Sequence, residues 1–470
     1  MRRALVVIAT LVLTAPTLPG PAAAQAAPPP GDISGNVEFV ANIPELKAAI
    51  SIAFIDDVMF VSTVHGVYSY DVSDPAAPQL LGSLPMYIWE NEDMDVDVDR
   101  RRIFISRDPR GFTSPAVPGD TFPYGAVHII DVSDPHLLTP VGSFLVPAGH
   151  TTTCVNDCDY VWTGGPFANA QTQPDYTGRP IYATDVRDPA NPVPCPEPID
   201  TGRNDGETDY AHDVQVDPDG IAWVSGAGGV RGYRTRGEHL DPLTGEVREA
   251  TACDPIPYGG GGTPSEATPS RFMHNAYRNP SARIPAEDDP ETEEDETLGH
   301  VLYATEENIT SNCGTSGRFV TYDLRGTYGG EGWRDIDQTH FRMRALDTWT
   351  PQDAEGATAC DSAHYFDDRG DGILAYAFYG QGTRFLDVSD PQDIRQIGYY
   401  RPDDANTWAP YWHDGYVFVS DFTRGVDIIR FEGEPEDDPV AAPPVATTRS
   451  LPMSSTFGYL CPIVGAVRVA

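Results

Sequence analysis

The stretch GTRFLDVSDP at residues 382–391 is the module from which most of this chain is built. Each copy is a short apolar strand that ends in Asp, followed by a turn of Ser, Asp and Pro. Asp and Ser side chains bond the backbone of such a turn, and Pro fixes its φ angle. The other copies, from close to worn, are YSYDVSDPAAP at 68–78, VHIIDVSDPHL at 127–137, IYATDVRDPANP at 181–192 and FVTYDLRG at 319–326.

A further strand usually follows the turn, as in PQLLGSL at 78–84 and RQIGYY at 395–400. One such unit cannot bury its own apolar face, so the copies must stack against one another. The chain divides into seven units of four strands, and the seventh lacks its last strand. NVEFVANIP at 36–44 resembles the missing strand and would close a ring without exposed edges. We therefore predict an all-β fold, a β-propeller of seven four-stranded blades closed by this N-terminal strand; a degenerate fourth unit leaves six or eight blades as alternatives.

The recurring DVSDP turn after an apolar strand, together with DGYVFVSDFTRGVDIIRF at 414–431, resembles the LVIVD-repeat family of bacterial and archaeal β-propellers. The resemblance covers residues 36–431. It implies an exported or cell-surface propeller and carries no agreed activity. The worn turns of the fourth and fifth units, and the acidic insert AEDDPETEEDET at 286–297, depart from the family pattern.

The two ends of the chain read as segments outside the propeller. Residues 1–24 have a double Arg, an apolar run too short to span a bilayer, and then small residues, which predicts a secretory signal peptide. Residues 25–35 form a Pro-rich lead-in. Residues 432–470 form an acidic, Pro-rich linker and a short apolar tail, with no firm membrane insertion. The expected location is secreted or at the cell surface.

Acidic residues dominate the composition. The 470 residues carry a formal net charge of −39, and Lys47 is the only lysine. Nucleic acid as a partner is therefore excluded, because it requires a cationic surface. Attraction for metal ions or cationic ligands, and a solubilising surface for an exported protein, both remain open. The partner is an unknown ligand or a cell-surface molecule.

Seven cysteines in an exported chain predict disulfide bonds. Cys154 and Cys158 flank a short turn and can bridge locally, although a Cys-x₃-Cys can also bind metal. The remaining expected bridges are Cys195–Cys253 and Cys313–Cys360, which leaves Cys461 in the tail.

Histidine recurs at the start of four successive units, as His150, His212, His274 and His364, at intervals of 62, 62 and 90 residues. Equivalent positions of a propeller lie at one height around the axis, so these imidazoles should face one mouth of the channel. Such a ring suits Zn, Cu, Ni or Fe, with Glu306 or Glu307 as an added carboxylate and Asp213 as an orienting group. The alternative is a polar position copied with the repeat, where each imidazole binds water or backbone.

The remaining motifs give weaker indications of function. DDRGDG at 367–372 begins like a calcium loop, but Arg369 occupies a ligand place, and a hairpin turn is the better interpretation. His413 is out of register with the other four histidines. Arg384 and Arg424 precede equivalent strands and either bind an anionic ligand or pair with nearby Asp. No hydrolase, P-loop or dinucleotide motif is present.

Two functions are consistent with these patterns. The first is an exported propeller that acts as a binding or surface-interaction module, with a His-lined metal site at one channel mouth. The second is a His-ligated, metal-dependent enzyme, an oxidoreductase or lyase, working at the same place. The sequence names neither a substrate nor a metal.

Overall fold

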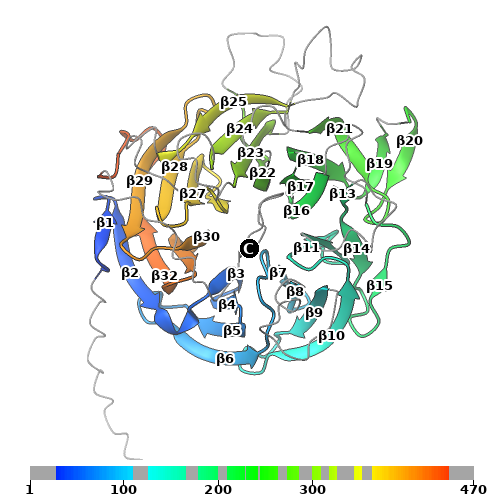
Figure 1. Cartoon of the computed structure of the whole chain (residues 1–470), viewed down its shortest axis with the longest axis horizontal. Coiled ribbons are helices and arrows are strands. Elements are labelled where there is room, and N and C mark those ends of the chain that lie inside the picture. The colour runs from blue at the N-terminus through cyan, green and yellow to red at the C-terminus, as the bar shows by residue number, and fades with distance from the viewer. Residues whose placement is uncertain are drawn as a thin grey trace, which may run out of the picture.

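A computed structural model describes residues 28–108, 125–165, 178–199, 209–227, 229–241, 244–262, 272–284, 299–307, 317–324, 343–351 and 362–443. Seven antiparallel blades stand in a ring around a central channel (Figure 1). The predicted seven-bladed β-propeller is therefore confirmed, including the degenerate fourth blade.

Each blade has four strands that run outward from the channel. Blade one contains β3 (Ala49–Ile55), β4 (Val58–Thr63), β5 (Gly66–Asp71) and β6 (Gln79–Pro85). Blade two contains β7 (Asp95–Asp97), β8 (Arg102–Arg107), β9 (Gly125–Asp131) and β10 (Thr139–Val146). Blade three contains β11 (Thr151–Val155), β12 (Tyr160–Gly164), β14 (Tyr182–Asp185) and β15 (Val193–Pro194). Blade four contains β16 (Asp209–Val216), β17 (Ile221–Ala227), β18 (Gly229–Arg234) and β21 (Ile256–Gly262).

The remaining blades follow the same order. Blade five contains β22 (Met273–Asn279), β23 (Val301–Glu306), β24 (Phe319–Asp323) and β25 (Arg344–Trp349). Blade six contains β26 (Phe366–Asp368), β27 (Ile373–Ala377), β28 (Thr383–Asp387) and β29 (Arg395–Pro402). Blade seven contains β30 (Thr407–His413), β31 (Tyr416–Asp421), β32 (Gly425–Phe431) and, from the N-terminus, β2 (Val37–Ile43). The additions are β1 (Gly31–Ile33), β13 (Gly178–Arg179), the hairpin β19 (Gly237–Leu240) and β20 (Val247–Ala250), and the 3₁₀ turn Pro44–Leu46.

Strand β2 closes the ring as predicted. It pairs antiparallel with β32 from Val37↔Phe431 to Ile43↔Val426, so the two ends of the propeller share blade seven. The structure adds two contacts at the predicted flanking segments. Strand β1, within the lead-in, pairs with β29, and the start of the C-terminal segment also docks there, since Val440 N donates to Gln396 O over 2.8 Å.

The DVSDP turns form through the side-chain bonds expected of them. Asp71 Oδ1 accepts the backbone N–H of Ser73 over 2.9 Å and its hydroxyl over 2.6 Å. Asp387 makes the same two bonds to Ser389, over 3.0 and 2.6 Å. The repeated sequence therefore encodes a repeated turn, which returns the chain from the third to the fourth strand of a blade.

Apolar side chains fill every gap between neighbouring blades. Seven buried clusters, each shared by two adjacent blades, account for the seven interfaces. Between blades one and two, for example, Phe60 and Val67 pack with Ile103 and Ile130. An eighth cluster, Ala48, Ile50, Val64, Tyr379 and Trp408, joins blades one, six and seven. We call it the apolar cluster.

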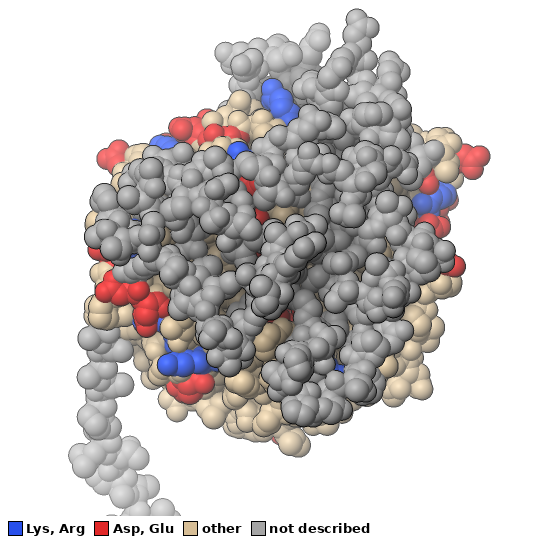
Figure 2. Space-filling view, in the orientation of Figure 1, with Lys and Arg blue, Asp and Glu red and all other residues tan. Residues whose placement is uncertain are grey.

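Two of the predicted disulfides, Cys154–Cys158 and Cys195–Cys253, are present. Cys313, Cys360 and Cys461, the signal peptide and the acidic insert lie outside the described residues. Within the described ranges, no helix has the length and apolar character needed to cross a membrane. Asp and Glu lie around the rim of the face in Figure 2, with Lys and Arg among them.

Candidate metal centre

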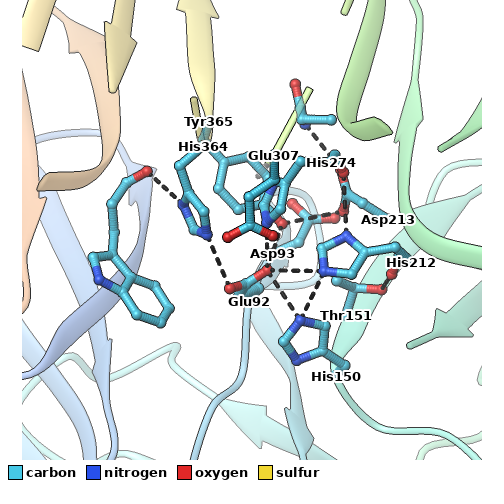
Figure 3. A network of polar contacts seen from close by, with 12 residues as sticks. Glu92, Asp93, His150, Thr151, His212, Asp213, His274, Glu307, His364 and Tyr365 are labelled. Carbon is cyan, nitrogen blue, oxygen red and sulfur yellow. Dashed lines mark hydrogen bonds and ion pairs between the residues drawn. The ribbon is translucent and has the colours of Figure 1, made fainter. Parts of the chain in front are cut away.

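The four histidines identified in the sequence stand where the innermost strands of blades three to six begin. His150 directly precedes β11, and His364 lies two residues before β26. His212 and His274 lie inside β16 and β22, each at a bulge in the pairing with the second strand. A bulge re-aims a side chain, and both imidazoles here join one polar network with the other two (Figure 3).

Backbone carbonyls of the next blade hold two of these rings. His212 Nδ1 lies 3.2 Å from His274 O, and His364 Nδ1 lies 2.7 Å from Trp408 O. A carbonyl only accepts, so each Nδ1 carries a proton, and Nε2 is the nitrogen that faces the other histidines. A neutral imidazole held in this way binds a metal through Nε2.

Carboxylates hold the His150 ring instead. Its Nδ1 lies 3.0 Å from Asp108 Oδ2 and 3.9 Å from Glu90 Oε2. Its Nε2 lies 2.9 Å from the Nε2 of His212. A carboxylate on the outer nitrogen raises the basicity of the inner one, as in many metal sites.

The inner nitrogens of all four rings surround one carboxylate that the sequence analysis did not predict, that of Glu92 (Figure 3). Nε2 lies 3.2 Å from Glu92 Oε2 for His150, 3.6 Å for His212 and 3.3 Å for His274, and 3.2 Å from Glu92 Oε1 for His364. Two sets, Glu92–His150–His212 and Glu92–His274–His364, each have donor atoms within 4.8 Å of one another. The predicted histidines thus lie around one carboxylate, as two pairs that each share Glu92.

Several of these atoms make no hydrogen bond although they are buried. Both ring nitrogens of His274, Nε2 of His364 and Oε1 of Glu92 have no partner of hydrogen-bond geometry. All three side chains are at most 1% exposed. Buried polar atoms without partners are rare because each costs about 1–3 kcal/mol.

Burial and neighbouring charges act against each other on the pKa values of this cluster. Burial acts to raise the pKa of Glu92, but the imidazoles of His150, His364 and His274 outweigh it, so this pKa lies well below its usual range. Burial lowers the pKa of His212 far below the ordinary value and also lowers that of His274. For His364, burial is outweighed by the carboxylates of Glu92 and Glu307, and its pKa is raised.

A second layer of acids lies beside the ring. Asp213 accepts hydrogen bonds from Asn275 Nδ2 over 2.8 Å and from Tyr365 OH over 3.3 Å. The same Tyr365 hydroxyl lies 3.4 Å from Glu92 Oε2. Burial raises the pKa of Asp213 to about 6, and that of Asp93 well above its usual value. The Tyr365 hydroxyl therefore connects Asp213 to Glu92.

The two glutamates predicted as extra ligands lie on opposite sides of their strand. Glu306 Oε2 accepts a hydrogen bond from Arg318 Nε over 3.0 Å, and neither glutamate belongs to a set of clustered donors. Glu307 lies beside the ring, where its Oε1 accepts from Tyr379 OH over 2.6 Å (Figure 3). Only Glu307 is therefore positioned near the histidines, because successive side chains of a strand alternate in direction.

The calcium-like loop, His413 and the two arginines lie outside the ring of four histidines in the described residues. DDRGDG forms the turn between β26 and β27, with Arg369 paired to Asp371. His413 stacks on Phe54 at a ring distance of 4.0 Å, away from the centre. The other two arginines differ: Arg424 pairs with Asp427 and Asp404, whereas Arg384 donates to Gln381 and Gln396.

A signal for Glu92 was present in the sequence. Asp95 pairs with Phe104 across β7 and β8, so extending the register two residues places Asp93 opposite Ser106, as Asp213 lies opposite Ser225. Glu92 then precedes Asp93 as His212 precedes Asp213. An alignment of inner strands would have placed a carboxylate at this position, whereas a search for histidine alone did not.

Comparisons with known proteins bear on the fold alone. No family model matches the chain, and no curated protein matches it, so the LVIVD resemblance stays a prediction. Among solved structures, the chain is similar to a periplasmic gluconolactonase, PpgL, of Pseudomonas aeruginosa, with a TM-score of 0.50 and 15% identity over 82% of this chain and 92% of that one. At this identity the likeness supports the propeller and transfers no activity.

Proposed function

We propose that this chain is an exported binding propeller whose binding site is one divalent transition-metal ion held by His150, His212, His274 and His364. The observation that carries the proposal is the convergence of four inner nitrogens on one carboxylate. Copied polar positions that each bind water or backbone would not need to meet at a point. Glu92 is the fifth donor in this proposal.

The donor set fits such an ion. Imidazole and carboxylate suit Zn, Cu, Ni and Fe, and a metal would satisfy the buried nitrogens of His274 and His364 that make no hydrogen bond. Five donors exceed the four of a structural zinc site, which favours Fe, Cu or Ni. The bound ion would supply a Lewis acid or a redox couple.

Charge balance supports the same proposal. Glu90, Glu92, Asp108 and Glu307 are at most 1% exposed and lie around the four imidazoles. Burying carboxylates is costly unless positive charge compensates them. A dication at the ring would provide that charge while the histidines stay neutral, as their use as ligands requires.

Export is supported by the two disulfides, Cys154–Cys158 and Cys195–Cys253. Disulfides persist in oxidising compartments and are rare in the cytosol. The acidic composition suits a protein that must stay soluble outside the cell.

The test is a metal analysis of the mature protein purified from an export-competent host without a histidine tag. We expect one transition-metal ion per chain by mass spectrometry. The double variant His150→Ala/His274→Ala should lose it, and His239→Ala, on the exposed hairpin β19–β20, should retain it. Absence of stoichiometric metal after reconstitution with Fe²⁺, Cu²⁺, Ni²⁺ and Zn²⁺ would refute the proposal.

A metal-dependent enzyme, an oxidoreductase or lyase, is the second candidate. The observation that favours it is Glu307, whose Oε2 makes no hydrogen bond although the side chain is fully buried beside the ring. A site that only binds the metal needs no such carboxylate. Substrate turnover by the metal-loaded protein that is lost in Glu307→Gln would indicate an enzyme. Absence of turnover would indicate a binding module.

A further inference from the structure

The carboxylate of Glu307 lies beside the four histidines. It directly follows β23, and its backbone N–H donates to Phe272 O over 3.1 Å, which ties it to the strand that carries His274. Figure 3 shows its carboxylate between His364 and His274. Its charge opposes the lowering of the His274 pKa by burial and adds to the raised pKa of His364, so the carboxylate lies near both imidazoles.

Tyr379 fixes the direction of this carboxylate. Its hydroxyl donates to Glu307 Oε1 over 2.6 Å, and its ring lies 4.9 Å from that of His364. Its backbone has φ of 36°, a conformation that costs a residue with a side chain about 1–3 kcal/mol. The amides of Gly382 and Thr407 hold it there by donating to Tyr379 O over 3.0 and 3.1 Å.

The second oxygen, Oε2, is left with no hydrogen-bond partner in a side chain that is fully buried. A buried carboxylate oxygen without a donor is unfavourable by itself. The neighbouring carboxylate, Glu306, is paired with Arg318, as is usual for a buried carboxylate. The donor that Glu307 lacks can arrive with a ligand.

We propose that Glu307 Oε2 accepts the hydrogen bond of a neutral, protic ligand of the metal, such as water or an alcohol, and excludes anions from the same position. This inference rests on the proposed metal centre. The carboxylates of Glu92 and Glu307 both repel a negative ligand, whereas an O–H group satisfies Oε2 without adding charge. Glu307 is thus a ligand-contacting residue and not a fifth or sixth metal ligand.

The experiment uses the mature protein loaded with Cu²⁺, with azide as an anionic probe that has no proton to donate and methanol as a neutral protic probe. Azide binding is followed by its charge-transfer absorption, and methanol binding by the electron paramagnetic resonance spectrum. In Glu307→Gln we expect azide to bind about tenfold more tightly and methanol about tenfold more weakly, since hydrogen bonds to charged groups are the strong ones. Glu306→Gln is the matched control and should change neither affinity.

Opposite shifts of the two probes would support the proposal, because a merely structural role of Glu307 would move both in one direction. Equal shifts, no shift, or no response of either probe in the wild-type protein would overturn it, since it requires an open ligand position. Loss of Cu²⁺ from Glu307→Gln would also overturn it, by making Glu307 a metal ligand. If the wild-type protein binds no metal, metal analysis alone shows this, and it refutes the proposed function before either probe is used.

Discussion

Blades three to six and blades seven and one use the same position of the inner strand for different chemistry. His212 and His274 occupy the bulges of β16 and β22, and Ile50 and Trp408 lie at the corresponding bulges of β3 and β30. One side of the channel is therefore a polar ring, and the other is the apolar cluster.

The backbone around these positions is alike on both sides. Ser225 of β17 donates to His274 O over 2.7 Å, and Ser420 of β31 donates to Ile50 O over 2.9 Å. The repeat therefore sets the direction of the side chain, and its identity decides between packing and ligand binding. A comparison of the two sides separates what the fold needs from what the site needs.

The largest expected effect is on the apolar side. Trp408→Ala should lower the free energy of unfolding of the metal-free protein by about 3–5 kcal/mol, because Trp408 is 2% exposed and leaves a cavity. His274→Ala should cost less than Trp408→Ala, because its ring is smaller and its nitrogens make no hydrogen bond that would be lost. Urea unfolding after treatment with a chelator measures both. Equal losses would contradict the division of roles.

Metal stabilisation should show the reverse pattern. At a metal concentration of about 100 times the dissociation constant, binding stabilises a folded protein by about 2.7 kcal/mol. We expect this gain in the wild-type protein and in Ile50→Ala, a variant of the apolar cluster, but not in His274→Ala at the same concentration. Thermal unfolding with and without added metal provides the measurement, with His239→Ala as the control. A gain in stability of His274→Ala on adding metal would show that His274 is not a metal ligand.

The third prediction concerns pH and the metal-free protein. Burial holds the pKa of His212 well below 6.5 in the folded state, so below about pH 6.5 only the unfolded chain takes up this proton. Stability should then fall as the pH falls, by up to about 1.4 kcal/mol per pH unit. The neutral His212→Gln should flatten this slope.

His364 acts in the opposite direction. Its raised pKa means that its contribution to stability is present at low pH and is lost as the pH rises through the folded-state value. Removing it by His364→Gln should steepen the acid-side loss, and Ile50→Ala, in the apolar cluster, should keep the wild-type profile. Unfolding free energies between pH 8 and pH 5 distinguish these cases, and parallel profiles for all variants would contradict the assigned directions.

The smallest effect compares the two serines. Ser225→Ala and Ser420→Ala each remove one buried hydrogen bond and should each cost about 1 kcal/mol of stability. Only Ser225→Ala should also weaken metal binding, because only Ser225 positions the backbone of a histidine. Isothermal titration with Cu²⁺ gives the second readout. Equal affinities in the two variants would show that the ring tolerates movement of its backbone.

Most of the fold could be predicted from the sequence because it depends on local chemistry. The DVSDP turns bond their own backbone, and the apolar strands between them can be buried only by stacking, so 382–391 and its copies encode a propeller before any long-range contact is known. The closing role of 36–44 followed from the one strand missing from the last blade. The recurrence of histidine likewise identified four positions that had to lie at one height.

Only the tertiary structure decided what stands between those histidines. Glu92 belongs to blade two and has no histidine beside it in the sequence, and it reaches the ring because seven blades bring their inner strands to one axis. The choice between Glu306 and Glu307 also depended on which face of β23 turns toward the channel. Such placements are set by closure of the ring and by bulges, which join residues hundreds of positions apart. The local sequence can show that Glu92 occupies the equivalent position of its strand, but not that it meets the histidines.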